Sequence, residues 1–181
     1  MTDKLAIFAS AVAGALSSSS VERDFLPLVR EAMRKLVATD DWLPPALAQP
    51  HPQHYQQYLL HRHPQGLFSV VSFVWGPGQS TPVHDHTVWG VIGMLRGAEI
   101  NMPYLPDGRD GLRAGVRTEL KPGDVGCVSP TLGDIHSVRN ALADAVSISI
   151  HCYGADIGKV RRHIHEPDGT VRDFISGYAN V

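Results

Sequence analysis

From residue 54 onward, short β-rich runs alternate with strong turn signals. The runs YQQYLLHR, LFSVVSFVW and AVSISIHCY have the length and the branched and aromatic content of strands. Turn signals punctuate this part of the chain at GPGQ, PDGRDG, KPGD and SPTLGD, where glycine, proline and aspartate favour tight turns. Many short strands joined by turns are typical of antiparallel sandwiches and barrels. We therefore expect a mainly β fold over residues 54–181, including a C-terminal tail.

Residues 1–50 have a helical character instead. Apolar residues recur at helical spacing in the first stretch: Leu5, Phe8, Val12 and Leu16. This spacing favours an amphipathic helix over a signal peptide, which the small apolar residues around it also resemble. A second helix is expected to begin with a capping box of Ser19 and Glu22. Its expected apolar face consists of Val21, Phe25, Leu28, Val29, Leu36 and Val37.

Length and composition narrow the class of protein. A chain of 181 residues is expected to form a single domain, residues 1–181. The net charge is −2 and no basic run is present, which argues against a nucleic-acid partner. Cys127 and Cys152 provide no disulfide framework and fit a reducing compartment. No apolar run is long enough to span a membrane, so we expect a cytoplasmic protein, either a monomer or a weak homo-oligomer.

Three His-x-His pairs occur in the chain: His61/His63, His84/His86 and His163/His165. On a strand, such a pair places both imidazoles on the same face, where they can bind one metal ion. An isolated pair is more often a pair of surface histidines, so the pattern alone is a weak signal.

The sequence around the middle pair resembles the two motifs of the cupin superfamily. Residues that match the first motif, G-x5-H-x-H-x3-4-E-x6-G, are Gly78, His84, His86 and Gly97. Residues that match the second motif, with one extra residue between its proline and glycine, are Pro130, Gly133, His136 and Asn140. The resemblance implies a cupin double-stranded β-helix, a small barrel, in which His84, His86 and His136 converge on a metal ion.

Gly90 occupies the position at which a typical cupin has a glutamate ligand. The site is therefore expected to offer three neutral histidines and no carboxylate. A divalent ion held in this way keeps its full charge and about three open positions, which favours direct binding of an anionic ligand such as a thiolate. A closed structural zinc site would need a fourth protein ligand, and the motifs supply none.

A second cluster lies in the run SISIHCYG. Ser149, His151 and Tyr153 alternate along one strand and so share a face, where each polar group can satisfy its neighbour. A polar outer face of an edge strand would give the same pattern. A serine hydrolase is not expected, because the three groups are stacked on one strand and no G-x-S-x-G elbow is present.

Together these features resemble the thiol dioxygenases, namely cysteine dioxygenase and the bacterial 3-mercaptopropionate dioxygenases. The resemblance extends from about Tyr55 to Arg162, through YQQYLL, SFVWGPGQSTPVHDHTVWG, GDIHSVRN, SISIHCYG and GKVRR. It implies a ferrous ion, Fe(2+), on the three histidines and a catalytic group of Ser149, His151 and Tyr153. It also implies a small thiol carboxylate and O2 as substrates, with a sulfinate as product.

Two positions point to the bacterial subgroup. Gln57 stands where cysteine-specific enzymes have a carboxylate-binding arginine, and Arg162 matches the arginine that binds the carboxylate of 3-mercaptopropionate. Gly90 also replaces the cysteine that bonds to the active-site tyrosine in those enzymes, so Tyr153 is expected to be unmodified. The alternatives are a cysteine dioxygenase and a non-catalytic cupin that binds a metal or small ligand.

Overall fold

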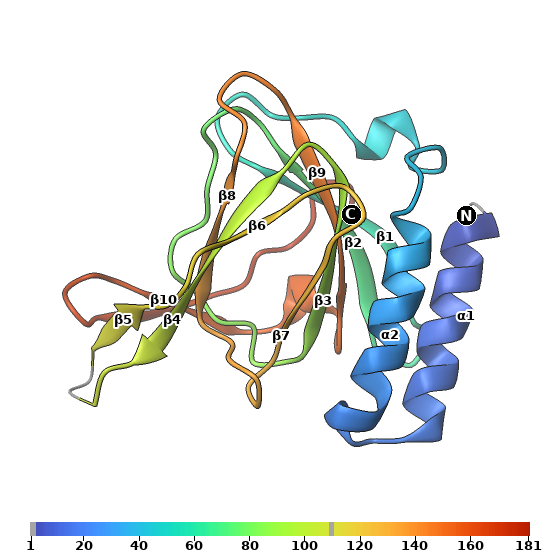
Figure 1. Ribbon diagram of the computed structural model, residues 1–181, viewed down its shortest axis with the longest axis horizontal. Helices are drawn as coiled ribbons and strands as arrows, with labels where there is room; N and C mark the ends of the chain where they lie inside the picture. Colours follow the sequence, from blue (N-terminus) through green and yellow to red (C-terminus); the bar gives the residue numbers. More distant parts are fainter. Residues whose placement is uncertain (1–2, 109–110) are drawn as a thin grey trace.

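The computed structural model describes residues 3–108 and 111–181. Two helices are followed by a β-rich body, and the helices pack against one side of that body (Figure 1). The helical elements are α1 (Asp3–Ser18), α2 (Glu22–Leu36) and the short 3-10 turns η1 (Pro45–Leu47) and η2 (Ile157–Lys159). The strands are β1 (Gln56–Arg62), β2 (Ser69–Trp75), β3 (Gly90–Arg96), β4 (Glu99–Pro106), β5 (Leu112–Ala114), β6 (Thr118–Leu120), β7 (Val125–Val128), β8 (His136–Asn140), β9 (Ser147–Tyr153), β10 (Arg162–His165) and β11 (Val171–Phe174).

The strands form three sheets that enclose a barrel. The first sheet has the order β1-β2-β9-β3-β7, and its neighbours are antiparallel. In the second sheet, β4 pairs with β5, β6 and β8, and the third consists of β10 and β11. His84 connects the sheet that contains β8 to the sheet that contains β10, because it pairs with His136 of β8 on one side and Ile164 of β10 on the other. This arrangement is the double-stranded β-helix that the sequence predicts.

Strands β2 and β9 are buried along their whole length. Alternate residues of β9, such as Ile148, Ile150 and Cys152, join the apolar core beneath the helices. Tyr153 belongs instead to a second cluster inside the barrel, with Phe73 and Trp75 of β2. Both faces of these strands therefore lie in protein, which explains why the β2 segment is almost continuously apolar.

The helices cover the outer face of the first sheet. The residues of α1 and α2 that are buried there are Leu5, Phe8, Ala9, Val12, Ala15, Phe25, Leu26, Val29, Met33 and Leu36. The spacing predicted for the first helix is thus confirmed. None of the helices in the described part of the chain has the length and apolarity needed to cross a bilayer.

Two details of the second helix were predicted wrongly. The capping box is absent: Ser19 accepts a hydrogen bond from the Val21 backbone N–H (3.0 Å) and lies before the helix, which begins at Glu22. Val21 and Leu28 are exposed, whereas Leu26 and Met33 face the core. Because α2 packs on both α1 and the sheet, its buried stripe is rotated toward α1.

Helix α2 packs tightly against the barrel at Gly93 of β3. A Cβ atom placed there would lie 2.7 Å from Met33 Cγ and 2.9 Å from Val37 Cγ1. We therefore predict that Gly93→Ala lowers the free energy of unfolding by about 1–3 kcal/mol, because the added methyl overpacks this contact. Chemical denaturation measures the difference.

Gly14→Ala is the matched control. No atom lies within 4 Å of a Cβ at Gly14, which sits on helix α1. Alanine favours a helix over glycine by about 0.5–1 kcal/mol, so this variant should be as stable as the wild type or more so. Equal stability of the two variants would contradict the overpacking argument.

Candidate metal centre

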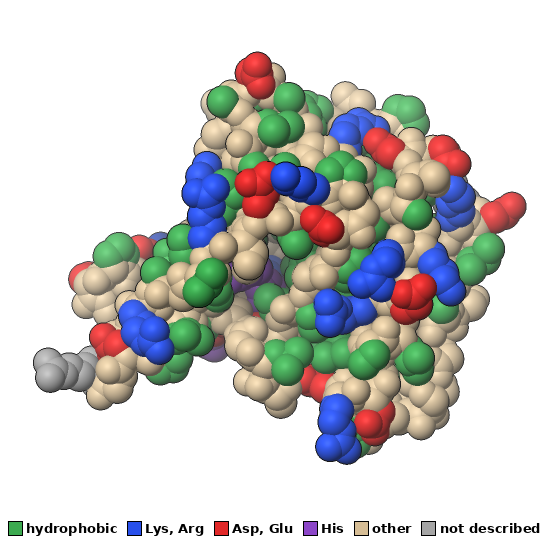
Figure 2. All heavy atoms as spheres, viewed as in Figure 1, with side chains coloured by type: hydrophobic (Ala, Val, Ile, Leu, Met, Phe, Trp, Pro, Cys, Tyr) green, Lys and Arg blue, Asp and Glu red, His purple; other side chains and the backbone are tan. Residues whose placement is uncertain are grey.

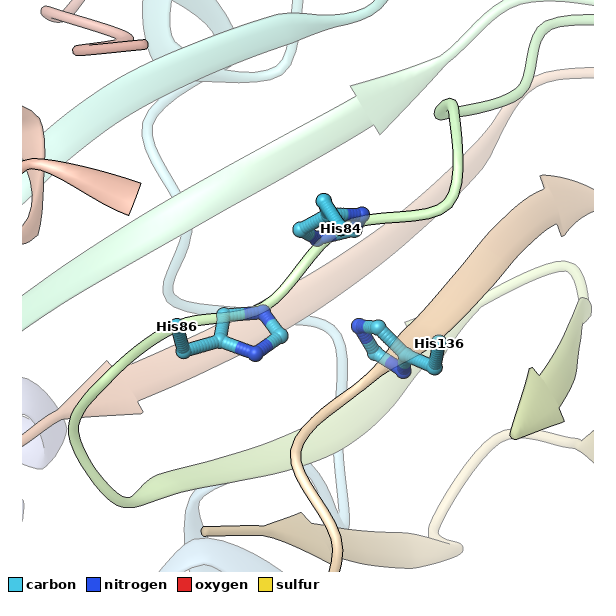
Figure 3. Close-up of side chains that lie close together, drawn as sticks. All are labelled: His84, His86 and His136. Carbon is cyan, nitrogen blue, oxygen red and sulfur yellow. The ribbon is translucent and has the colours of Figure 1, made fainter. Parts of the chain in front are cut away.

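Three buried histidines converge inside the barrel (Figure 3). One ligand nitrogen from each of His84, His86 and His136 lies within 4.8 Å of those from the other two. The pair His84 and His86 is on the irregular segment between β2 and β3, so the expectation that it lies on a strand was wrong. Two mutual backbone hydrogen bonds of 2.9 Å between His84 and His136 hold the segment against β8 instead.

Hydrogen bonds at Nδ1 fix the orientation of each ring. The acceptors are the Pro82 carbonyl for His84 (3.0 Å), Asp134 Oδ1 for His86 (3.1 Å) and Asn101 Oδ1 for His136 (2.6 Å). Since each acceptor is an oxygen, Nδ1 carries the proton and Nε2 keeps its lone pair. The three lone pairs therefore remain available for a shared ion, as in metal sites where outer partners orient the ligands.

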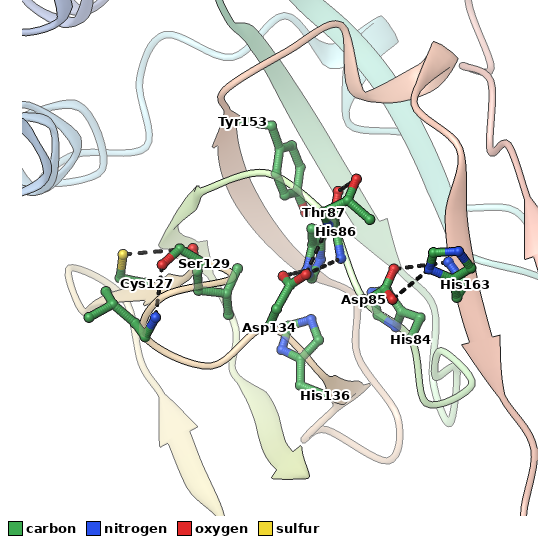
Figure 4. A network of polar contacts seen from close by, with 12 residues as sticks. His84, Asp85, His86, Thr87, Cys127, Ser129, Asp134, His136, Tyr153 and His163 are labelled. Carbon is green, nitrogen blue, oxygen red and sulfur yellow. Dashed lines mark hydrogen bonds and ion pairs between the residues drawn. The ribbon is translucent and has the colours of Figure 1, made fainter. Parts of the chain in front are cut away.

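Among the residues that orient the histidine ligands, Asp134 accepts the most hydrogen bonds. Besides binding the His86 ring, its carboxylate accepts the backbone N–H groups of His86 (3.0 Å) and Thr87 (2.8 Å), as Figure 4 shows. Thr87 has a φ of 59°, a left-handed conformation that is costly for a β-branched residue. The Asp134 contacts offset this cost and hold the turn that follows the two ligands.

The electrostatics favour neutral imidazoles. Burial lowers the pKa of His84 to about 3 and also lowers the pKa of His136 well below the usual range. Hydrogen bonds from His86 and the nearby backbone help hold the pKa of Asp134 below its usual value, against the effect of burial. Three imidazole nitrogen donors suit a divalent transition ion such as iron, zinc, copper or nickel. The residues present therefore fit a metal site.

At position 90 there is no room for a side chain that could act as a fourth ligand. A Cβ at this position would lie 2.8 Å from Cε1 of Tyr153, so a side chain there would point at the tyrosine ring. Within residues 3–108 and 111–181, the three histidines are the only cluster of His, Cys, Asp or Glu that could hold an ion. Cys127 and Cys152 are free, and Cys152 lies in the core on the opposite face of β9 from Tyr153.

The other two histidine pairs have different surroundings. His163 and His165 contact the carboxylate of Asp85 at 2.8 and 3.4 Å, so that residue serves as a structural clamp between the ligand segment and β10. His61 and His63 flank the ring of Phe68.

Ser149, His151 and Tyr153 form a continuous hydrogen-bonded row along the inner face of β9. Ser149 Oγ lies 2.8 Å from His151 Nε2, and His151 Nδ1 lies 2.8 Å from the Tyr153 hydroxyl. All three are buried, and burial raises the pKa of Tyr153 while lowering that of His151. The tyrosine ring stacks on His86 with centroids 5.3 Å apart. The row therefore ends directly beside the three histidines.

Arg162 is a buried cation without a carboxylate partner. It is 3% exposed, lies over the Phe174 ring at 4.5 Å, and donates to Ser176 Oγ at 2.5 Å. Its Nε has no hydrogen-bond partner, and no ion pair to it occurs among the described residues. Burial lowers the pKa of Arg162, and electrostatic interactions with Tyr153 and, more weakly, with Asp85 oppose this shift.

Gln57 lies on β1, and its side-chain Oε1 is also buried without a hydrogen-bond partner. The C-terminal tail lies against this strand: Ala179 donates to the Gln57 carbonyl, and Asn180 bonds both backbone groups of Leu59. The predicted site residues thus include two buried polar groups with unused hydrogen-bonding capacity.

Several solved structures have limited similarity to this chain. A conserved protein with a double-stranded β-helix domain from Klebsiella pneumoniae shares 18% identity over 61% of this chain and 80% of that chain, with a TM-score of 0.49. A cupin superfamily protein from Desulfitobacterium hafniense shares 13% identity over 65% of this chain and 94% of that chain, with a TM-score of 0.47. An oxalate oxidase bound to the substrate analogue glycolate shares 14% identity over 58% of this chain and 53% of that chain, with a TM-score of 0.47.

These similarities are too weak to indicate a function. No protein-family model matches the sequence. The function proposed below is therefore inferred from the geometry of the site together with the resemblance of the sequence motifs.

The ligand set leads to a direct test. We predict that His136→Ala abolishes stoichiometric metal binding, because two imidazoles remain where three converge. His63→Ala and His165→Ala should keep the wild-type metal content, which elemental analysis of iron-loaded protein measures. A His136→Ala protein with full metal content would contradict the assignment.

Burial of neutral imidazoles also predicts a pH dependence of the metal-free protein. The folded-state pKa values of His84 and His136 lie below the ordinary value of 6.5, so the unfolded chain binds more protons once the pH falls below it. This stability contribution is present above pH 6.5 and is progressively lost as the pH falls toward the folded-state values. The free energy of unfolding, measured with a chelator present, should fall less in His136→Gln than in the wild type between about pH 7 and about pH 5. Groups that titrate in both proteins cancel in this comparison. An equal decrease in the free energy of unfolding of the two proteins would contradict burial of His136 as the cause.

Proposed function

We propose that this chain is a non-haem iron(II) thiol dioxygenase that oxidises a small thiol carboxylate, preferentially 3-mercaptopropionate, with O2 to the sulfinate. One observation carries the proposal: a buried site of three imidazoles lies beside a hydrogen-bonded tyrosine, and the described residues supply no carboxylate ligand. A site without an anionic ligand leaves the charge of a divalent ion to an anionic substrate.

Iron is proposed because of the resemblance to thiol dioxygenases, since imidazoles alone also suit other metals. When bound, iron(II) supplies open positions for a thiolate and redox chemistry with O2. The overall reaction balances without another reductant. Both atoms of O2 bond to sulfur, O2 gains four electrons, the sulfur loses four, and the thiol proton is retained by the sulfinic acid or released.

Arg162 is proposed to bind the substrate carboxylate. Its guanidinium is already desolvated and has an unpartnered Nε, so a carboxylate would gain charge-assisted hydrogen bonds at little further desolvation cost to the arginine. Ser176 holds one Nη in place. Gln57, with its unpartnered side-chain oxygen, is proposed to assist at the same end of the substrate.

Tyr153 is proposed to donate a hydrogen bond to the substrate or to the oxygen that reacts. His151 orients its hydroxyl, Ser149 orients His151, and stacking on His86 fixes the ring. Because burial raises the pKa of Tyr153, its hydroxyl keeps its proton at neutral pH. The tyrosine therefore acts as a hydrogen-bond donor and not as a charged base.

O2 consumption by iron-loaded protein with a panel of thiols tests the proposal. We expect a higher kcat/KM for 3-mercaptopropionate than for L-cysteine, with one O2 consumed per sulfinate formed. Removing the Arg162 guanidinium should cost on the order of 2–5 kcal/mol of carboxylate binding. For Arg162→Ala this corresponds to a kcat/KM at least about 30-fold lower with 3-mercaptopropionate.

Cysteamine and Arg161→Ala provide the controls. Cysteamine has no carboxylate, so it should be a poor substrate whose turnover barely changes in Arg162→Ala. Arg161 is exposed and paired with Asp173 at 2.8 Å, so Arg161→Ala should behave as the wild type. No O2 uptake with any thiol would rule out the dioxygenase, and a large preference for L-cysteine would reject the proposed substrate alone.

A further inference from the structure

Phe174 is an aromatic residue beside the site that none of the roles above uses. It is the last residue of β11, and its side chain is half-buried. The guanidinium carbon of Arg162 lies 4.5 Å from the centroid of its ring. The same ring lies beside the metal ligand His84, with centroids 6.4 Å apart and planes at 79°. One aromatic ring thus packs on the proposed carboxylate-binding group and next to a ligand imidazole.

Strand pairing places these three side chains on one face. His84 forms a bridge with Ile164 of β10. Two residues earlier on the same strand, Arg162 pairs with Phe174 of β11. Side chains at paired positions share a face, and so do side chains two residues apart on a strand. The backbone therefore fixes the juxtaposition of the imidazole, the guanidinium and the ring.

Two groups near the C-terminus hold the Arg162 guanidinium. The ring of Phe174 covers one side of it, and Ser176 Oγ accepts a hydrogen bond from one Nη at 2.5 Å. A cation over an aromatic face is attracted by the electrons of the ring, and most strongly where water is excluded. A single hydrogen bond would let the planar group pivot about that contact. The ring removes this freedom, while Nε remains without a hydrogen-bond partner.

The two ends of the proposed substrate site differ in access to solvent. Figure 2 shows a hollow on the face that β6 and β7 cross, with histidine side chains inside it. Arg162, by contrast, is 3% exposed. A carboxylate bound by this arginine is therefore held inside the protein. The length of such a ligand has to match the distance between the guanidinium and the imidazoles.

We propose that Phe174 is a positioning residue that fixes the Arg162 guanidinium relative to the three histidines and thereby sets the chain length of the bound thiol carboxylate. The inference deepens the proposed thiol oxidation and rests on it for the identity of the ligand. With sulfur at the histidine site and the carboxylate at Arg162, a ligand that is one methylene shorter or longer leaves one end poorly bound. This discrimination requires that the guanidinium cannot move to follow the ligand.

Calorimetry of zinc-loaded protein measures the chain-length preference without turnover. The probes are 2-mercaptoacetate, 3-mercaptopropionate and 4-mercaptobutyrate. We expect the wild type to bind 3-mercaptopropionate at least about tenfold more tightly than either homologue. In Phe174→Leu this preference should fall below about threefold, because the aliphatic side chain has no flat face to hold the guanidinium. Phe174→Tyr keeps the ring and should keep the preference of the wild type.

Two controls separate positioning from a general loss of structure. Ile175→Ala changes the neighbouring residue, whose side chain is 58% exposed, and should leave the preference unchanged. Cysteamine has no carboxylate, so it should bind equally to the wild type and to Phe174→Leu. The zinc content of each variant should equal that of the wild type, because none of the substitutions removes a ligand.

The Nε–H proton of Arg162 reports its stacking without any thiol present. Protons over the face of an aromatic ring are shifted upfield in NMR spectra. The wild type and Phe174→Tyr should therefore show an upfield Nε–H signal that is absent from Phe174→Leu. Arg162→Ala identifies this signal by its loss.

Each outcome decides part of the proposal. An unchanged chain-length preference in Phe174→Leu, a wild type without such a preference, or an Arg162 signal that ignores the substitution overturns the role of Phe174. If the stacking signal is present but no thiol carboxylate binds, Phe174 still positions the arginine, while the proposed substrate class and its chain-length selection are rejected. Should Phe174→Leu fail to fold, Phe174→Met replaces it, because methionine fills similar space without a flat ring.

Discussion

The structure depends on the complete burial of strand β9. One face of this strand must be apolar because the helices cover it, and its residues there are Ile148, Ile150 and Cys152. The other face lies inside the barrel, where polar side chains are tolerated only if they satisfy one another. Hydrogen bonding along the strand meets this condition. The same condition fixes the position of the tyrosine, so the packing of the fold and the arrangement of the site have one cause.

Charge defines the chemistry of this interior. Burial opposes protonation of His84 and His136, while Arg162 is a buried cation without an ion-pair partner among the described residues. A divalent ion on the imidazoles would add further positive charge. Such a site would suit the proposed dianionic substrate, which has a soft sulfur at one end and a carboxylate at the other. The charge distribution thus gives the proposed substrate class a physical basis in addition to the sequence resemblance.

The spacing of residues in the sequence predicted the parts of the site that lie on a regular strand or within one of the two cupin-like motifs. Alternation along a strand placed Ser149, His151 and Tyr153 on one face, and the two motifs brought His136 to the histidine pair. The partners that orient the rings were missed, because Asn101 and Asp134 come from other segments and no local pattern marks them. The one available signal was that Asp134 lies within the second motif.

Elsewhere, tertiary contacts overruled local preference. The capping box at Ser19 failed because the hydroxyl bonds to the Val21 N–H and the Asp24 side chain ahead of the helix. The histidine pair was expected on a strand, yet its segment is irregular and held by bridges to β8 and β10. The burial of Glu99 at the start of β4 also had no signal in the sequence, since an acidic residue at a strand start is ordinarily exposed.

The C-terminal tail introduces a thermodynamic linkage between the end of the chain and the proposed substrate. Ser176 bonds Arg162, and Asn180 is tied to the backbone of β1 beside Gln57. A ligand that needs the ordered arginine therefore binds more tightly when the tail is docked. Linkage is reciprocal, so the same ligand must strengthen tail docking by an equal free energy. Protection of the tail backbone from hydrogen exchange should therefore increase when the ligand is bound inside the barrel.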